Sequence, residues 1–246
     1  MTSTGLQSTP QPGLLRRRLQ RVADVLAART RIALGYPAEL PTADRRVLEQ
    51  QIFPALARDP SVNTLVFAGC DWYTAHYERL LAGLTLHTLD PDPRRRQFGA
   101  ARHHVAPLQS LDSLLAPNSV DAIVCNGVYG WGLDARADCE RAFRACAACL
   151  RPGGWFVLGW NNVPDHDPAP LALVAFDGFA AQAHPSLGSA HHEVAGSVDR
   201  HTFAFFRRTL AAVAPGPAAS MPSLPASLPA SLPTSLPAHA GAAPLP

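Results

Sequence analysis

The sequence predicts an α/β fold, with a doubly wound, mostly parallel sheet, an antiparallel last strand and helices ahead of the sheet. Short apolar runs alternate with helix-compatible segments between residues 62 and 160, as in parallel strands joined by helical crossovers. The last two runs are separated only by residues 196–200, a length that suits a hairpin. With 246 residues, 47% of them hydrophobic, the chain can build one large domain with appendages.

The first 60 residues are expected to lie outside the sheet. Residues 1–13 are polar and are predicted to be disordered. Residues 14–34 have apolar positions at three- and four-residue steps, with six Arg against one Asp, which indicates a basic amphipathic helix. Packing on the domain is favoured for this helix, and a membrane-surface contact or a targeting role is the alternative. A second helix is predicted over residues 43–58, so the N-terminal helical segment is residues 14–60, with Thr42 as its candidate cap.

The main domain is predicted over residues 61–208. Strands are expected at residues 62–68, 84–89, 103–106, 120–125, 155–160 and 201–206, with a weaker one at 192–195. Helices are expected at residues 73–82, 93–101, 110–115, 134–150 and 171–183. After Arg208 there is no Asp, Glu, Lys or Arg, and residues 223–238 repeat Ser-Leu-Pro-Ala/Thr four times. Proline at every fourth position excludes helix and sheet, so residues 209–246 are predicted to be a disordered tail.

The amino-acid composition limits which partners and which cellular compartment are expected for this chain. Twenty-one Arg, with no Lys, nearly balance 19 acidic residues at a net charge of +2, so no nucleic-acid partner is expected. No apolar run is long enough for stable membrane insertion. An odd set of five cysteines suits a reduced, cytoplasmic compartment.

No metal site is expected. Cys139, Cys146 and Cys149 share one face of a predicted helix, which favours a buried face over a metal cluster. The neighbours in His191-His192-Glu193 point to opposite faces of a strand and cannot easily share one ion.

The candidate chemistry lies at the ends of the predicted strands, because ligands of open parallel sheets bind beyond the carboxyl ends. The first strand runs into Gly69-Cys-Asp71-Trp-Tyr73, and the second ends at Asp90. The fourth strand leads into Asn126-Gly-Val-Tyr129-Gly-Trp131, and Leu-Arg-Pro-Gly-Gly at 150–154 precedes the fifth.

These motifs, in this order, resemble the class I S-adenosylmethionine-dependent methyltransferases over about residues 62–208. The resemblance implies a Rossmann-like fold, S-adenosylmethionine as cofactor and a methyltransferase activity. The turn at residues 150–154 is the family's usual entry to its fifth strand. The first loop departs from the pattern, because the positions of the family's acidic residue and alternating glycines hold Phe67, Gly69, Asp71 and Tyr73, and only Gly69 matches.

The resemblance suggests Gly69, Asp71, Asp90 and Asn126 as cofactor-binding residues. Asp90 can accept both hydroxyl hydrogens of a ribose; a helix cap is its alternative role, although Asp92 is better placed for that. For Asp71 two roles are open: binding the cofactor's amino group, or capping the helix that follows.

Tyr129 and Trp131 resemble the family's substrate-facing lip, where aromatic faces favour a sulfonium, and Asn126 can orient an acceptor there. No catalytic residue is assigned, because positioning can carry most of an in-line methyl transfer.

The leading prediction is S-adenosylmethionine-dependent methyl transfer to a small-molecule or sugar-type acceptor. The alternative is a catalytically silent, methyltransferase-like binding or partner subunit, which the altered first loop suggests. A nicotinamide-dependent oxidoreductase is disfavoured, because residues 69–74 do not form Gly-x-Gly-x-x-Gly. The acceptor and the oligomeric state are not predicted.

Overall fold

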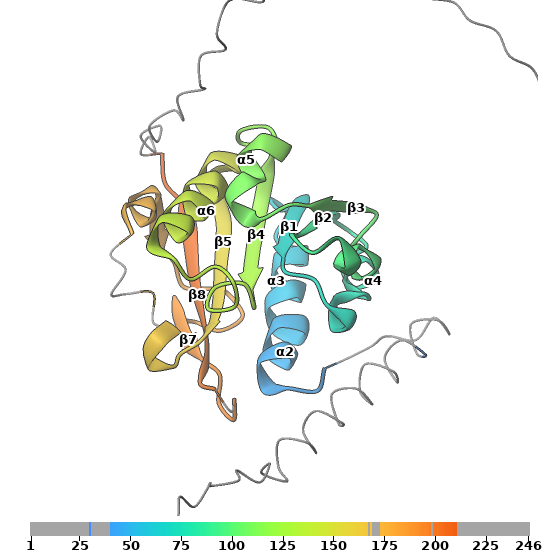
Figure 1. Cartoon of the computed structure of the whole chain (residues 1–246). Helices are drawn as coiled ribbons and strands as arrows, with labels where there is room; N and C mark the ends of the chain where they lie inside the picture. Colours follow the sequence, from blue (N-terminus) through green and yellow to red (C-terminus); the bar gives the residue numbers. More distant parts are fainter. Residues whose placement is uncertain (1–29, 31–39, 167, 169–172, 198, 211–246) are drawn as a thin grey trace, which may run out of the picture. The chain divides into compact units, whose positions relative to one another are not determined.

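The computed structural model describes residues 30, 40–166, 168, 173–197 and 199–210 (Figure 1). The predicted disordered segment 1–13 lies outside the described residues. The same holds for the basic helix at 14–34 apart from Thr30, and for the tail after residue 210.

The described domain is built on one mixed sheet. Its strands are β1 (Thr64–Ala68), β2 (Thr85–Asp90), β3 (Arg102–Val105), β4 (Val120–Asn126), β5 (Leu150–Asn161), β6 (Phe179–Ala181), β7 (His191–Glu193) and β8 (His201–Arg208). The strand order is β3-β2-β1-β4-β5-β8-β6, with β7 also paired to β8. Strands β1 to β5 are parallel, and β8 is antiparallel to β5, β6 and β7. The predicted fold class is therefore confirmed, including the antiparallel last strand and its hairpin with β7.

The predicted N-terminal helix at 43–58 is continuous. It consists of α2 (Ala43–Val47), a wider π-helical turn η1 (Leu48–Ile52) and α3 (Phe53–Arg58). Thr42 occupies the cap position, but its hydroxyl makes no cap hydrogen bond. The other long helix, α6 (Arg136–Cys149), also lies where it was predicted.

The remaining helical segments of the described residues are short. They are η2 (Trp72–Thr74), α4 (Tyr77–Leu80), η3 (Pro93–Phe98), η4 (Leu108–Ser110), α5 (Leu111–Leu114), η5 (Pro164–His166) and η7 (Val174–Gly178). All but η5, which lies where no helix was predicted, fall in or beside helices expected from the sequence. The helix predicted over residues 171–183 is wrong in its described part, where a 3₁₀ turn leads into β6. Phe179 packs its ring 4.9 Å from that of Phe156, so the tertiary contact overrides the helical pattern.

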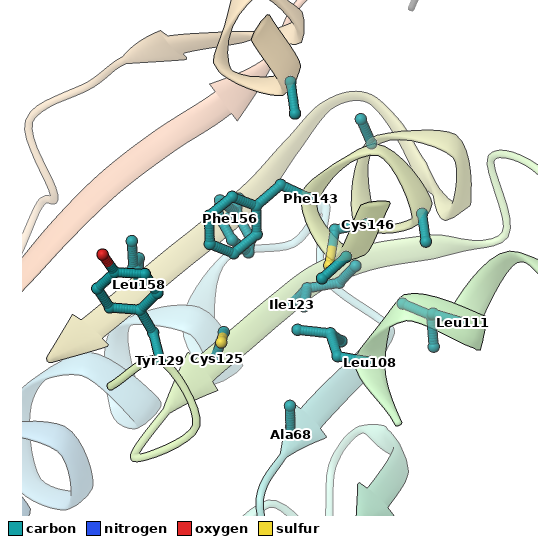
Figure 2. Close-up of a cluster of buried hydrophobic side chains, with 14 of the residues drawn as sticks. Ala68, Leu108, Leu111, Ile123, Cys125, Tyr129, Phe143, Cys146, Phe156 and Leu158 are labelled. Carbon is teal, nitrogen blue, oxygen red and sulfur yellow. The ribbon is translucent and has the colours of Figure 1, made fainter. Parts of the chain in front are cut away.

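The hydrophobic core consists of two clusters, one on each face of the sheet, because successive side chains of a strand point to opposite faces. One cluster joins α5, α6 and η7 to side chains such as Val66, Ile123 and Phe156 (Figure 2). The other joins α2, α3 and α4 to the neighbouring residues Phe67, Val124 and Val157. Helices thus cover both faces of the sheet, as the nearly continuous apolar strands require.

The three cysteines of α6 lie in the first of these clusters. Cys139, Cys146 and Cys149 are fully buried and free, as the helical spacing predicted. Over the described ranges, no group of three or more His, Cys, Asp or Glu side chains is arranged to hold a metal ion. No helix within those ranges is long and apolar enough to cross a bilayer.

Candidate functional site

The order of the strands reverses between β1 and β4, which lie side by side in the sheet. Such a switch point opens a crevice beyond the carboxyl ends of the strands, and ligands of open α/β sheets bind there. The loops that follow β1, β2 and β4 meet at this edge. We refer to the two halves of the edge as the β1–β2 half and the β4–β8 half.

Gly69 begins the loop after β1 and requires a glycine for two reasons. Its φ of +87° lies in the left-handed region, and a Cβ there would approach Val128 Cγ2 to 2.7 Å. Its N–H donates to the carbonyl of Leu89 at 3.0 Å. Gly69 therefore ties the loop after β1 to β2 and allows close contact with the loop after β4.

Asp90 ends β2 at the position predicted for ribose binding. The residue is 6% exposed, and its two oxygens accept backbone N–H groups of Cys70 and Asp92, each at 2.9 Å. A carboxylate oxygen has two lone pairs, so one per oxygen is left over after the bonds within the described part of the chain. That arrangement suits the two hydroxyls of a vicinal diol. Asp92, as the sequence indicated, is the residue that caps η3, by accepting the Arg94 N–H at 3.0 Å.

Asp71 is engaged by the protein itself. Its carboxylate accepts the Trp72 N–H at 2.8 Å and forms a capping box with Thr74 at the start of η2. Its second oxygen pairs with Arg95 Nη1 at 2.9 Å. Of the two roles left open by the sequence, the geometry matches the helix cap, and the Arg95 pair already neutralises the charge that an ammonium group would need.

Arg45 is a site residue that sequence reasoning missed. It comes from α2, is buried, and its guanidinium lies 4.3 Å from the centroid of the Tyr73 ring. Nη1 donates to the Tyr77 hydroxyl at 3.0 Å, and Nη2 is 3.5 Å from where a Cβ of Gly127 would lie. Nε finds no hydrogen-bond partner among the described residues, and the Asp44 carboxylate is 3.8 Å away. The burial of this cation between the loops after β1 and β4 provides a donor for an anionic group.

Asn126 ends β4 and is 1% exposed. Its side-chain amide fills the space over Gly159 of β5, where a Cβ would collide with it. The Asn126 Oδ1 atom lies 2.9 Å from His201 Nε2, while the Nδ2 atom has no partner within the described ranges. Burial lowers the pKa of His201 to about 4, so this imidazole is neutral at neutral pH. His201 was also missed, because its contact with Asn126 spans 75 positions of the chain.

The two predicted lip residues do not come together. Tyr129 is buried in the core cluster, with its ring 6.5 Å from that of Phe143 (Figure 2). Trp131 is 66% exposed and is not part of that cluster. The structure thus contradicts the lip role predicted for Tyr129, whose ring lies in the core, whereas Trp131 is exposed. The turn through Gly127 and Gly130, which both have positive φ, returns the Tyr129 ring to the core.

The donors and acceptors present at the edge fit S-adenosylmethionine in part. The remaining lone pairs of Asp90 suit the ribose, and the Arg45 guanidinium suits the carboxylate of the methionine end. Asn126 adds a buried amide with one unpartnered atom at the end of β4.

Comparisons with known proteins agree with this fold. Residues 68–158 match a family model described as a methyltransferase domain. Among solved structures, the chain resembles the N-methyltransferase NodS from Bradyrhizobium japonicum WM9, with 18% identity, a TM-score of 0.52, and 67% of this chain and 96% of that chain covered. A second structure of NodS, in complex with S-adenosyl-L-homocysteine, matches with 17% identity, a TM-score of 0.53 and coverage of 67% and 87%. No curated protein sequence matches the chain.

A TehB-like S-adenosylmethionine-dependent methyltransferase from Corynebacterium glutamicum is also similar. Its identity is 18%, its TM-score is 0.51, and 81% of this chain and all of that chain are covered. At such identities these likenesses concern the fold.

Proposed function

We propose that this chain, whose residues 68–158 match the model of a methyltransferase domain, transfers the methyl group of S-adenosylmethionine to a small-molecule acceptor. The observation that carries the proposal is Asp90, a buried carboxylate at the carboxyl end of β2 that retains one lone pair on each oxygen. The near-balanced charge of the chain favours a small acceptor, such as one of sugar type, over a polyanion.

Different residues of this chain bind different parts of the cofactor. Asp90 binds the ribose hydroxyls, and Gly69 allows the backbone after β1 to approach the cofactor closely. Arg45, rather than Asp71, binds the charged methionine end, through its carboxylate. When bound, S-adenosylmethionine supplies an activated methyl carbon that a nucleophile can attack in line.

Asn126 orients the acceptor at the end of β4. Positioning is the main contribution required of the protein, because the leaving group already carries a positive charge.

The test is isothermal titration of the full chain with S-adenosylmethionine, and with NAD as the matched control. Binding of S-adenosylmethionine in the micromolar range without binding of NAD is expected. Absence of binding to both would favour the alternative, a silent methyltransferase-like subunit. That alternative rests on the loop after β1, in which only Gly69 matches the pattern of the family.

The role of Arg45 has its own test in decarboxylated S-adenosylmethionine. The wild-type chain should bind the normal cofactor about tenfold more tightly than the decarboxylated form, and Arg45→Met should abolish this preference. An unchanged preference in Arg45→Met would remove the residue from the site.

A further inference from the structure

Three side chains form a continuous relay at the ends of β4, β5 and β8. His201 Nδ1 lies 2.8 Å from Asn161 Oδ1, and His201 Nε2 lies 2.9 Å from Asn126 Oδ1. Asn161 and His201 are direct neighbours in the β5–β8 register, and Asn126 pairs with Gly159 between β4 and β5. The relay therefore belongs to the sheet itself rather than to a loop.

The outer end of the relay fixes the tautomer of His201. Asn161 donates from Nδ2 to the Asp199 carboxylate at 3.3 Å, so its Oδ1 is the atom that faces the imidazole. An oxygen in that position needs a donor, and Nδ1 must carry the proton. Asp199 thus determines which nitrogen of His201 is protonated.

The inner end of the relay then requires a donor from Asn126. His201 is 5% exposed and neutral, because burial and the Arg45 cation lower its pKa more than the carboxylates of Asp44 and Asp199 raise it. A neutral ring with its proton on Nδ1 has a lone pair on Nε2. With Asn126 Oδ1 at 2.9 Å from Nε2, two acceptors would face each other. A half-turn of the Asn126 amide exchanges its oxygen and its NH₂ and places a donor against Nε2, which makes a good hydrogen bond.

We infer that His201 is a positioning residue, which holds the Asn126 NH₂ and thereby leaves the Asn126 carbonyl oxygen as the unpaired atom for an N–H or O–H group of the methyl acceptor. The inference rests on the proposed function, since it assigns the acceptor to the β4 end of the site. It provides an acceptor, His201 Nε2, for the buried Asn126 Nδ2, which has no partner in the described part of the chain. It also narrows the acceptor to amines, ammonium groups, amides and alcohols, since a carbonyl oxygen cannot accept from a thioether or a tertiary amine.

The tautomer can be measured without any acceptor. In the full chain labelled with ¹⁵N-histidine, long-range ¹H–¹⁵N spectra at pH 7 should show His201 protonated on Nδ1 and unprotonated on Nε2. In Asn126→Asp, which cannot donate to Nε2, His201 should take up a second proton and become an imidazolium at pH 7. His192→Gln, at a half-buried position of β7, serves as the matched assignment control. A proton on Nε2 in the wild-type chain would overturn the inference.

The orientation of the Asn126 amide can be tested with two inert cofactor analogues. Sinefungin carries an amine in place of the methylsulfonium, and S-adenosylhomocysteine has no donor at that position. The wild-type chain should bind sinefungin at least about tenfold more tightly than S-adenosylhomocysteine. His201→Leu should lose this preference while its affinity for S-adenosylhomocysteine stays within about twofold.

His201→Gln is the second variant, because its side-chain oxygen can still accept from the Asn126 NH₂, and it should keep part of the preference. An equal preference in wild-type and His201→Leu chains would overturn the inference. Failure of the wild-type chain to bind either analogue would overturn the proposed function instead, and the tautomer measurement would remain valid.

Discussion

The two halves of the carboxyl edge are held in different ways. In the β1–β2 half, Asp90 and Asp71 accept backbone N–H groups, the farthest of them 20 positions away. In the β4–β8 half, Asn126, Asn161 and His201 contact one another through side chains over 40 and 75 positions. Backbone anchoring makes the first half insensitive to the chemistry of its neighbours. The second half depends on one tautomer of His201, on one orientation of the Asn126 amide and on the lack of a Cβ at Gly159. Substitutions should therefore disrupt the second half more easily than the first.

Acid should produce the largest effect, and it acts on the β4–β8 half. Burial lowers the pKa of His201 to about 4, against an unfolded value near 6.5, so the unfolded chain takes up the proton first as the pH falls. This contribution to the free energy of unfolding is complete above pH 6.5 and is lost towards pH 4, by on the order of 3 kcal/mol. Urea unfolding at pH 7, 6, 5 and 4 measures it.

His201→Gln should remove part of this pH dependence and no more. His184, whose pKa burial also lowers to about 4, keeps its share in that variant. An identical slope in the variant and the wild-type chain would show that His201 is not the group that titrates.

Asp90→Ala tests the backbone-anchored half and should weaken S-adenosylmethionine binding by about 1.5–3 kcal/mol, the range for hydrogen bonds to a charged group. The melting temperature should also fall, because the variant leaves the N–H groups of Cys70 and Asp92 without their acceptor. Asp92→Ala is the matched control, since it removes a nearby carboxylate that caps η3. Equal affinities of the two variants, by titration, would exclude Asp90 from the ribose site.

Gly159→Ala should disturb the β4–β8 half by adding a single carbon. The new Cβ would collide with the Asn126 amide, and overpacking of this kind costs about 1–3 kcal/mol. The His201 ring signals should shift with it. Gly83→Ala, where a Cβ would meet nothing within 4 Å, is the control and should change the unfolding midpoint little. Similar midpoints for both variants would mean that Asn126 can move aside freely.

Asp71→Ala should have the smallest effect. Loss of the cap at η2 costs about 1 kcal/mol of stability, and S-adenosylmethionine affinity should stay within about threefold. A loss of affinity beyond tenfold would restore to Asp71 the ammonium-binding role that the sequence left open.

The features that could be predicted from the sequence differ from those that could not in the same way, by whether they depend on local or on distant parts of the chain. The strands, α6 and the buried cysteines were predictable because apolar periodicity is a local signal, and the position of Asp90 follows from where β2 ends. His201 and Arg45 were not predictable, since their partners come from distant elements. Tyr129 was placed at the lip by its motif, but the glycine turn directs its ring inward. The strand β6 was missed because its pairing with β8 depends on aromatic contacts across the sheet.

Asn126 and Gly159 occupy one shared volume, which has a consequence for any set of related sequences. An amide at position 126 is compatible only with the smallest residue at position 159, because the two lie opposite each other on neighbouring strands. Natural variants should therefore exchange the two positions together, with a larger residue at 159 accompanied by a smaller one at 126. Such a paired exchange would also remove the unpaired amide. Residue 159 lies on the sheet and carries no functional group, yet its identity would predict which relatives retain this mode of acceptor binding.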